Sequence, residues 1–154
     1  MKNNKGLTII ELVIVLTIIA TIVGIIVPTY IRYVEKAKRV ADVHTAIEIK
    51  NAYEHIIALY DPGTSVASST YTHAVMWAPD SSMPDPNKTN LTLSQQVFLE
   101  LGEVPKSKTY KDYFWIVEYD GLNGFVNKIS ITSAPNSSVR YELYPNSNAF
   151  LKGQ

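Results

Sequence analysis

The first 31 residues combine a basic leader with an apolar run that holds a single charge. Lys2 and Lys5 lie in residues 1–6, and Glu11 carries the only charge in residues 7–31. About 20 apolar residues span a bilayer as a helix, so this run is long enough to cross a membrane. A carboxylate at that depth is costly. We therefore expect Glu11 to have a function and a specific cationic partner.

Cleavage of the chain between Gly6 and Leu7 would create such a partner. Glu11 lies five residues after Gly6. A cut at this point gives Leu7 a free ammonium group, and Glu11 of a neighbouring copy can pair with that group inside an apolar bundle. Glu11 is therefore predicted to direct how copies of the chain assemble.

The segment Gly6-Leu7-Thr8-Ile9-Ile10-Glu11 resembles the processing site of the type IV pilin family, which includes the pseudopilins of type II secretion and competence systems. In that family, prepilin peptidase cuts after the glycine and methylates the new N-terminus, and the glutamate guides subunit docking. The resemblance implies cleavage after Gly6, N-methylation of Leu7 and an assembly role for Glu11.

The resemblance extends through the apolar run and covers about the first third of the chain. Pro28, Tyr30 and Tyr33 stand where the family has a proline and two aromatic residues near the end of its apolar segment. The resemblance implies that these residues also contribute to filament assembly.

Two simpler kinds of segment share part of this pattern. A secretory signal peptide has an apolar core of roughly 7–15 residues and a small-residue cleavage site, whereas this run is longer and contains Glu11. A plain membrane anchor has the right length but does not account for Glu11 or for its distance from Gly6. We favour pilin-like processing, with a plain anchor as the main alternative.

Charge and cysteine content limit the remaining possibilities. The 14 basic and 14 acidic residues balance, so the chain has no general affinity for nucleic acid or acidic surfaces. No cysteine is present, so the disulfide of many pilins cannot form. We interpret this as favouring a source without a disulfide-forming periplasm, such as a Gram-positive cell. The basic leader is expected to face the cytoplasm, with the rest of the chain outside.

The apolar run is predicted to continue as one helix from Thr8 to Tyr60, about 80 Å long. Residues 32–60 form its amphipathic half, because apolar residues recur there every three or four positions. The predicted apolar stripe contains Val40, Val43, Ala46, Ile49, Tyr53, Ile56 and Tyr60, and the predicted polar face contains Asp42, His44, Glu48, Lys50, Asn51 and Glu54. Pro28 predicts a kink or an open turn, since it lacks the N–H of the helical bond to Gly24.

Turn residues predict the end of this helix at Asp61-Pro62-Gly63. The next thirty residues indicate a long surface connection anchored in the core near Trp77, with short strands there as the alternative. Thr92-Leu93-Ser94-Gln95 has the form of a capping box, which predicts a helix from Leu93 to Leu101 that ends near Gly102.

The last forty residues alternate with a period of two. The predicted strands are Tyr113–Tyr119, Phe125–Thr132 and Val139–Tyr144, joined by turns. An antiparallel meander of three or more strands, with one face on the long helix and the other wet, gives an α+β fold.

No pattern indicates catalysis or a cofactor. His44, His55 and His73 lack the spacing of metal ligands, and no phosphate-binding loop or nucleophile motif is present, so we expect neither an enzyme nor a metal site. A basic cluster, Arg32, Lys36, Lys38 and Arg39, is expected to reach lipid head groups where the helix leaves the membrane, or to pair with acids of adjacent subunits, with DNA binding as a further alternative.

These observations predict four segments: a cleaved leader (1–6), a transmembrane and filament-core helix (7–31), an amphipathic half-helix (32–60) and a loop-and-sheet domain (61–154). The expected function is that of a structural pilin. The precursor is expected to cross the cytoplasmic membrane once, and prepilin peptidase and the pilus assembly machinery are its expected partners. The expected product is a homopolymeric extracellular pilus for adhesion, twitching motility or DNA uptake. The alternatives are a pseudopilin and a membrane-anchored binding module that does not polymerise.

Overall fold

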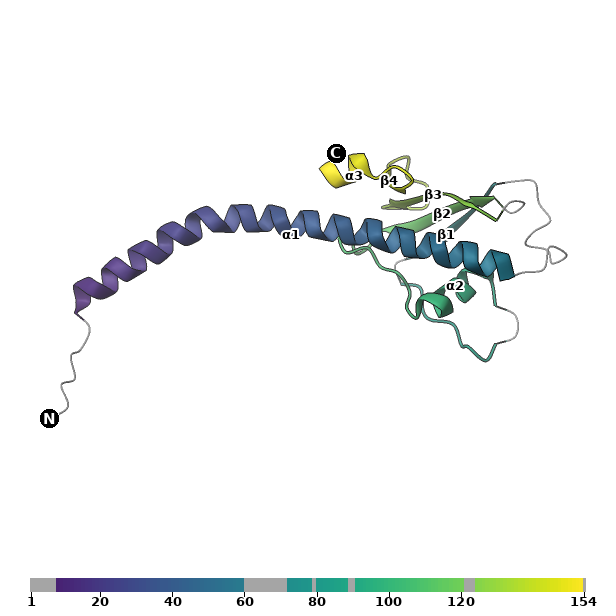
Figure 1. The fold of residues 1–154 in the computed structure, drawn as a ribbon, viewed down its shortest axis with the longest axis horizontal. Coiled ribbons are helices and arrows are strands. Elements are labelled where there is room, and N and C mark those ends of the chain that lie inside the picture. The colour runs from purple at the N-terminus through teal and green to yellow at the C-terminus, as the bar shows by residue number, and fades with distance from the viewer. Residues whose placement is uncertain (1–7, 60–71, 79, 89–90, 121–123, 154) are drawn as a thin grey trace. The chain divides into compact units, whose positions relative to one another are not determined.

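A computed structural model describes residues 8–59, 72–78, 80–88, 91–120 and 124–153. It divides into two compact units, residues 1–37 and residues 38–154, and helix α1 (Ile9–Leu59) crosses the boundary between them (Figure 1). The long helix predicted from Thr8 to Tyr60 is confirmed. Its predicted end at Tyr60 and the turn residues 61–63 lie outside the described residues.

Pro28 lies inside α1, and the helix continues past it without a break. The expected open turn at this residue is therefore wrong for the chain as it stands. Proline removes one backbone hydrogen bond, but the bonds on either side remain and hold the backbone helical. The bend itself stays a prediction.

The second unit contains a four-stranded antiparallel sheet in the order β1-β2-β3-β4. The strands are β1 (Thr72–Trp77), β2 (Phe114–Asp120), β3 (Val126–Thr132) and β4 (Arg140–Tyr144). The three predicted strands are confirmed to within one residue at each end, and the α+β fold is confirmed with them. The predicted surface connection is wrong at β1, where the alternative of a short strand is confirmed. Strand β1 pairs with β2 from Thr72↔Asp120 to Trp77↔Trp115.

The core lies between the inner face of the sheet and residues 46–56 of α1. Ala46, Ile49, Tyr53 and Ile56 of the helix are buried with alternate residues of the central strands, among them Trp115, Val117, Ile129 and Ile131. Trp77 is the predicted anchor: its ring stacks on Tyr53 at 5.7 Å between centroids and meets Phe98 edge-on at 4.8 Å. The core is therefore aromatic where β1, α1 and α2 meet.

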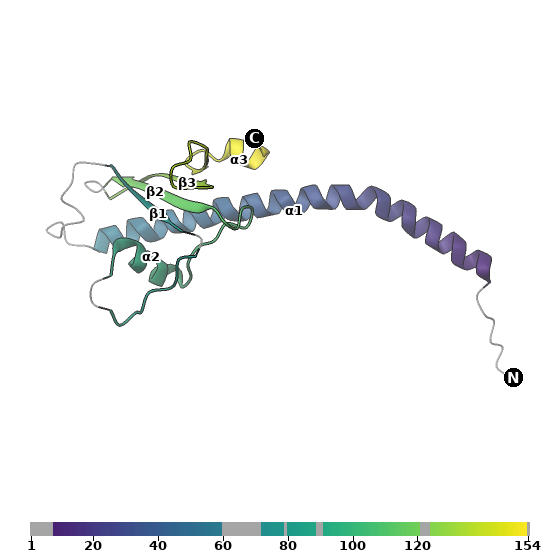
Figure 2. The same cartoon turned by 180° about the vertical axis from the view of Figure 1, so that it is seen from behind.

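Helix α2 (Leu93–Leu101) and the short helix near the C-terminus, labelled α3 (Asn148–Lys152), lie on opposite sides of α1 in both views of the fold (Figures 1 and 2). The predicted capping box is present, because the N–H of Gln95 donates to Thr92 Oγ1 at 3.3 Å and the N–H of Thr92 donates to Gln95 Oε1 at 3.0 Å. Gly102 ends the helix with φ 73°, a left-handed conformation that favours glycine. Both predicted ends of this helix are confirmed.

The short helix α3 (Asn148–Lys152) was not predicted, and it gives Arg39 an internal role. Nη1 of Arg39 donates to the carbonyl of Phe150 at 2.8 Å, and the guanidinium lies 5.6 Å from the centroid of the Phe150 ring. The contact is close, since a Cβ at Gly153 would come within 3.1 Å of Arg39 Nη1. Arg39 therefore holds the C-terminal helix.

The outer face of the sheet is not uniformly wet, which corrects the sequence prediction. Ile116 is 1% exposed and its cross-strand neighbour Ser130 is 0% exposed on this face. Two ion pairs flank these residues, Arg140–Glu118 at 3.3 Å and Lys128–Glu142 at 3.6 Å. Long charged side chains cover apolar surface with their methylene stems, and this accounts for the burial at the centre of the face.

Asp42 was assigned to the polar face of the helix, and this assignment is wrong. It is completely buried, and its carboxylate accepts hydrogen bonds from the hydroxyl of Ser107 at 2.8 Å and from the N–H groups of Lys108 at 2.5 Å and Thr109 at 3.0 Å. Asp42 lies four residues before Ala46, so helical spacing places it on the buried stripe. It fixes the segment between α2 and β2 to α1.

Other members of the predicted stripe and polar face also change place. Val40 is 51% exposed, and Lys50 and Glu54 form a half-buried ion pair at 2.5 Å. Val43, in contrast, packs against the core as predicted. Glu54 also accepts from the N–H of Val126 at 3.3 Å. The buried stripe is therefore rotated away from Val40.

Asp42→Ala is expected to lower the free energy of unfolding of the second unit by roughly 3 kcal/mol, because it leaves three donors around a buried site without an acceptor. This corresponds to a loss of about 10 °C in Tm. Thermal melts of the full chain in detergent, followed by circular dichroism, would measure it. Asn51→Ala, at an exposed position of the same helix, is the matched control. Equal Tm values for the two variants would show that Asp42 does not stabilise this segment.

Candidate functional site

The apolar part of α1 is exposed along its whole described length. Every residue from Thr8 to Tyr33 is exposed, and α1 contains a stretch that is long and apolar enough to cross a membrane, with none of that stretch buried. Contiguous apolar surface of this extent marks a site of interaction with lipid or with other proteins. The second unit builds its own core with the later part of the helix, so this stretch is available for such a contact.

The hydroxyl groups of Thr17 and Thr21 in this stretch are satisfied by the helix itself. Thr17 donates to the carbonyl of Val13 at 2.8 Å, and Thr21 donates to the carbonyl of Ile18 at 2.8 Å. Bonds of this kind let threonine sit in an apolar helix without an outside partner. Glu11 is the one charged residue in residues 8–31.

Glu11 forms a reciprocal cap at the start of α1 with Thr8. Its Oε2 accepts from the N–H and from the hydroxyl of Thr8, both at 2.8 Å, and its own N–H donates to Thr8 Oγ1 at 3.4 Å. This is a capping box, in which two of the backbone N–H groups left free at a helix start find acceptors. This role was not predicted, although the Thr8-Ile9-Ile10-Glu11 spacing is the signal that identifies it.

The cap leaves part of the carboxylate available. Both bonds from Thr8 end on Oε2, and among the described residues no donor reaches Oε1. Glu11 is exposed, so a cation from another molecule can approach it. The predicted cleavage residues, Gly6 and Leu7, lie outside the described residues.

Pro28, Tyr30 and Tyr33 do not form a cluster with Glu11. Pro28 follows Glu11 by 17 residues, or about 26 Å along an α-helix. Tyr30 and Tyr33 are 66% and 72% exposed. The predicted assembly residues are therefore distributed along an exposed helical surface and do not converge on a pocket.

The described residues contain no group of three His, Cys, Asp or Glu side chains that could hold a metal ion. Two histidines have carboxylate neighbours: His44 lies 3.3 Å from Glu48, and His55 lies 3.1 Å from Glu100. Both pairs are largely exposed and lie on the same side of α1 as α2.

Pro28→Ala is expected to restore one backbone hydrogen bond in the exposed stretch and to leave the second unit unchanged. Proline in a helix interior costs about 3 kcal/mol relative to alanine, so a stiffer helix should alter the yield or bending of any filament it forms. Filament yield from whole cells and the Tm of the full chain in detergent separate the two effects. Thr29→Ala, one residue further along, is the control. An unchanged filament with Pro28→Ala would show that the proline has no part in assembly.

Comparison with known proteins identifies the N-terminal segment. Residues 1–27 match the family model described as the prokaryotic N-terminal methylation motif. No curated protein and no solved structure matches the chain. The matched segment contains Gly6, Leu7 and Glu11, and together with the exposed apolar stretch of α1 it fits the precursor of a type IV pilin or pseudopilin. The first 27 residues thus carry the N-terminal methylation motif, which is the class III signal peptide of type IV pilins.

Proposed function

We propose that this chain is a structural subunit of a type IV pilus, without enzymatic activity. The observation that carries the proposal is the methylation motif in residues 1–27, joined to an apolar helical stretch that is exposed throughout and holds one carboxylate. Prepilin peptidase would cut after Gly6 and methylate Leu7. The pilus assembly machinery would then move the subunit from the cytoplasmic membrane into an extracellular filament.

In such a filament the helices of neighbouring subunits replace lipid around the apolar stretch. Glu11 Oε1 would meet the Leu7 ammonium of the next subunit, and an ion pair fixes the register of helices that apolar packing alone leaves free to slide. Head-to-tail contacts between different surfaces of identical subunits generate a helical filament when they do not close into a ring. The second unit would form the filament surface, as expected for adhesion, twitching motility or DNA uptake.

A pseudopilin is the second candidate, since the matched motif occurs equally at the start of such chains. The long polar segments of the second unit favour a displayed pilus surface over a short piston. The absence of cysteine from the chain supports a Gram-positive source as part of the same proposal.

The test is the composition of material sheared from the surface of cells that express the native chain. Electron microscopy should show filaments, and mass spectrometry should find this chain as their main subunit, beginning at methylated Leu7. Cleaved chain that remains in the membrane and is absent from the sheared fraction would favour the pseudopilin. Uncleaved chain in the membrane would support the alternative that the segment is a plain membrane anchor.

A further inference from the structure

Basic residues of the second unit gather where its part of α1 begins. Lys38 and Arg39 are the first two residues of that unit, and both lie one turn before the buried Asp42 on the same side of the helix. Asp42 accepts from the N–H of Lys108, so the backbone of this lysine lies against the same turn of α1. The side chains of Lys38 and Lys108 are exposed and make no ion pair among the described residues.

Three tyrosines continue this surface beyond Lys108. The rings of Tyr110 and Tyr113 stack at 4.5 Å between centroids, and the ring of Tyr141 stacks on Tyr110 at 5.5 Å. All three are half-buried, so part of each ring remains exposed. The N–H of Tyr113 donates to the carbonyl of Tyr110 at 3.1 Å, which closes a turn that carries the exposed Lys111. The surface therefore places aromatic rings beside lysines.

Helix α3 brings a further lysine to the same surface. The ring of Phe150 lies 6.5 Å from Tyr110 and 6.1 Å from Tyr141 between centroids. The carbonyl of Phe150 accepts from Arg39, and Lys152, two residues further on, is exposed. Both views show α3 at the opposite end of the second unit from the C-terminal end of α1 (Figures 1 and 2). The cations of α3 and of the start of this unit thus lie at one end of it.

We call this surface the Lys–Tyr patch, and it has an excess of positive charge. Two carboxylates belong to it: Asp42 is buried beneath the patch and hydrogen-bonded, and Asp112 is exposed in the turn that carries Lys111. Five cations outnumber these two acids. The patch consists of Lys38, Arg39, Lys108, Tyr110, Lys111, Tyr113, Tyr141 and Lys152.

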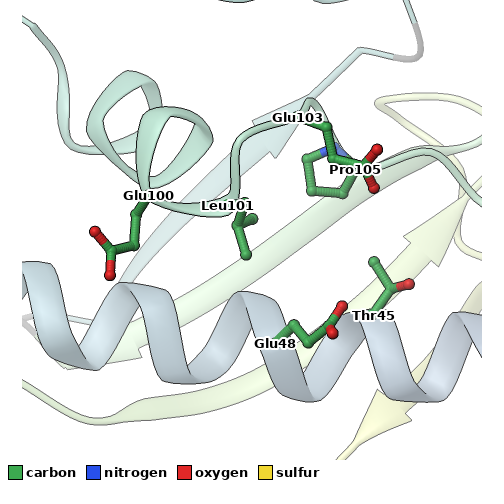
Figure 3. A pocket seen from close by; sticks show the side chains of 6 residues that line it. All are labelled: Thr45, Glu48, Glu100, Leu101, Glu103 and Pro105. Carbon is green, nitrogen blue, oxygen red and sulfur yellow. The ribbon is translucent and has the colours of Figure 1, made fainter.

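Three carboxylates of the second unit gather at a different place. They line a cleft between α1 and the C-terminal end of α2 (Figure 3), which is formed by Thr45, Glu48, Glu100, Leu101, Glu103 and Pro105. Glu48 follows Lys38 by ten residues on α1, or about 15 Å along the helix. Since acids and bases occupy different parts of the unit, an anionic surface would attract the patch and repel the cleft. Such a surface would therefore orient the unit.

The covalent chain keeps the Lys–Tyr patch close to the membrane. Seven residues separate Lys38 from Ile31, where the apolar run ends. They span about 10 Å as an α-helix and at most about 25 Å in any conformation, whatever the arrangement of the two units. Head groups extend about 5–8 Å beyond the hydrocarbon core, and charges interact over about 8 Å in physiological salt. The intervening residues add Arg32 and Lys36, with Glu35 as their one acid.

We propose that the Lys–Tyr patch binds the anionic head groups of the membrane that anchors the chain, and holds the second unit against the bilayer. The cations face lipid phosphates, and the tyrosine rings lie at the level of the head groups, where tyrosine is enriched in membrane proteins. Head-group contact was expected only for cations of α1. The fold adds a surface from three further segments of the chain. The inference rests on the membrane-anchored state alone, which a pilin, a pseudopilin and a plain anchor share.

Fluorescence quenching in the full-length chain, reconstituted in bilayers, tests the contact. The native chain has no cysteine, so Ala149→Cys introduces one thiol for a fluorescent label, on an exposed residue of α3. A small fraction of the lipid carries a nitroxide on its head group. The label should be quenched more strongly in phosphatidylcholine with phosphatidylglycerol than in phosphatidylcholine alone, and high salt should remove the difference. Ala58→Cys, exposed near the C-terminal end of α1, is the control and should be quenched equally in both bilayers.

Neutral variants provide the second measurement. Each cation near an anionic surface contributes roughly fivefold to binding, so Lys108→Gln with Lys111→Gln should weaken the contact roughly 25-fold. Quenching of the label on Ala149→Cys should then fall to the level in phosphatidylcholine. Lys88→Gln with Lys128→Gln changes two lysines outside the patch, has the same net charge and should be quenched like the native chain.

Three results would overturn the inference. The first is equal quenching of the Ala149→Cys label in both bilayers at low salt, and the second is an equal loss of quenching in the two double-lysine variants. The third is a label that responds to added duplex DNA and not to phosphatidylglycerol, which would assign the patch to nucleic acid. The measurement needs no filament, so its failure leaves the proposed pilus intact, and failure of the pilus leaves this contact standing.

Discussion

Gly6→Val is expected to stop processing and to leave the whole precursor in the membrane. A peptidase that cuts between Gly6 and Leu7 must hold the backbone closely, and a branched side chain at Gly6 displaces the scissile bond. Small displacements in an active site cost about a hundredfold in rate. Mass spectrometry of membrane and sheared fractions should find the N-terminus at residue 1 in the variant and at methylated Leu7 in the native chain.

Gly6→Ala, with the smallest added side chain, is the matched control and should retain part of the cleavage. Expression and membrane insertion should be equal in all three chains, because residues 7–31 are unchanged. A chain with Gly6→Val that still begins at Leu7 would show that the cut does not depend on the glycine.

Glu11→Ala is expected to lower filament yield roughly tenfold or more, with cleavage and membrane insertion preserved. Alanine removes the carboxylate that would pair with the Leu7 ammonium of the next subunit, so the apolar helices lose the contact that sets their register. The measurement is the amount of subunit in the sheared fraction, relative to cleaved subunit in the membrane.

Two further variants separate docking from helix capping. Glu11→Gln keeps the shape and an acceptor for Thr8 but loses the charge, so it should reproduce the loss of filaments if the charge is required. Thr8→Val removes the two bonds of the Thr8 hydroxyl and keeps the Glu11 charge. Loss of an N-cap side chain costs about 1 kcal/mol, which should fray the helix start and spare the filaments. A normal filament yield from Glu11→Ala, at equal cleavage, would show that assembly does not require Glu11. It would also strengthen the plain-anchor alternative.

Local signals predicted those elements whose ends depend on neighbouring residues. The capping box at Thr92 and the glycine at residue 102 determine both ends of α2, since the bonds involved span only three or four residues. The turn before β3 is similar: Gly124 has φ 71°, and its N–H donates to the carbonyl of Asp120 at 2.9 Å. The α-carbon hydrogen there faces Ile57, because a Cβ would lie 3.1 Å from Ile57 Cγ2.

Features that depend on distant contacts were missed. Strand β1 is six residues long, and pairing with β2, more than thirty residues away, makes it a strand. Asp42 is a charged residue, and its burial depends on three hydrogen-bond donors in Ser107, Lys108 and Thr109. These donors lie 65 or more residues further along the chain, so the local pattern does not reveal them. The Thr8–Glu11 cap is different, since its spacing is visible in the sequence. An acid in an apolar run also indicates a partner outside the chain, and that reading does not require the cap.

The Thr8–Glu11 cap also affects what docking and removal of a subunit would change at Glu11. In a single subunit the Glu11 carboxylate already accepts two hydrogen bonds from Thr8. In the proposed filament, docking against the Leu7 ammonium of a neighbour would exchange or extend these bonds. The free energy gained at Glu11 would then be only the difference between two states in which its carboxylate is hydrogen-bonded. In the proposed filament, the ion pair at Glu11 would therefore set the register of a subunit more than it would hold the subunit in place. A subunit removed from such a filament would still have its Thr8–Glu11 cap.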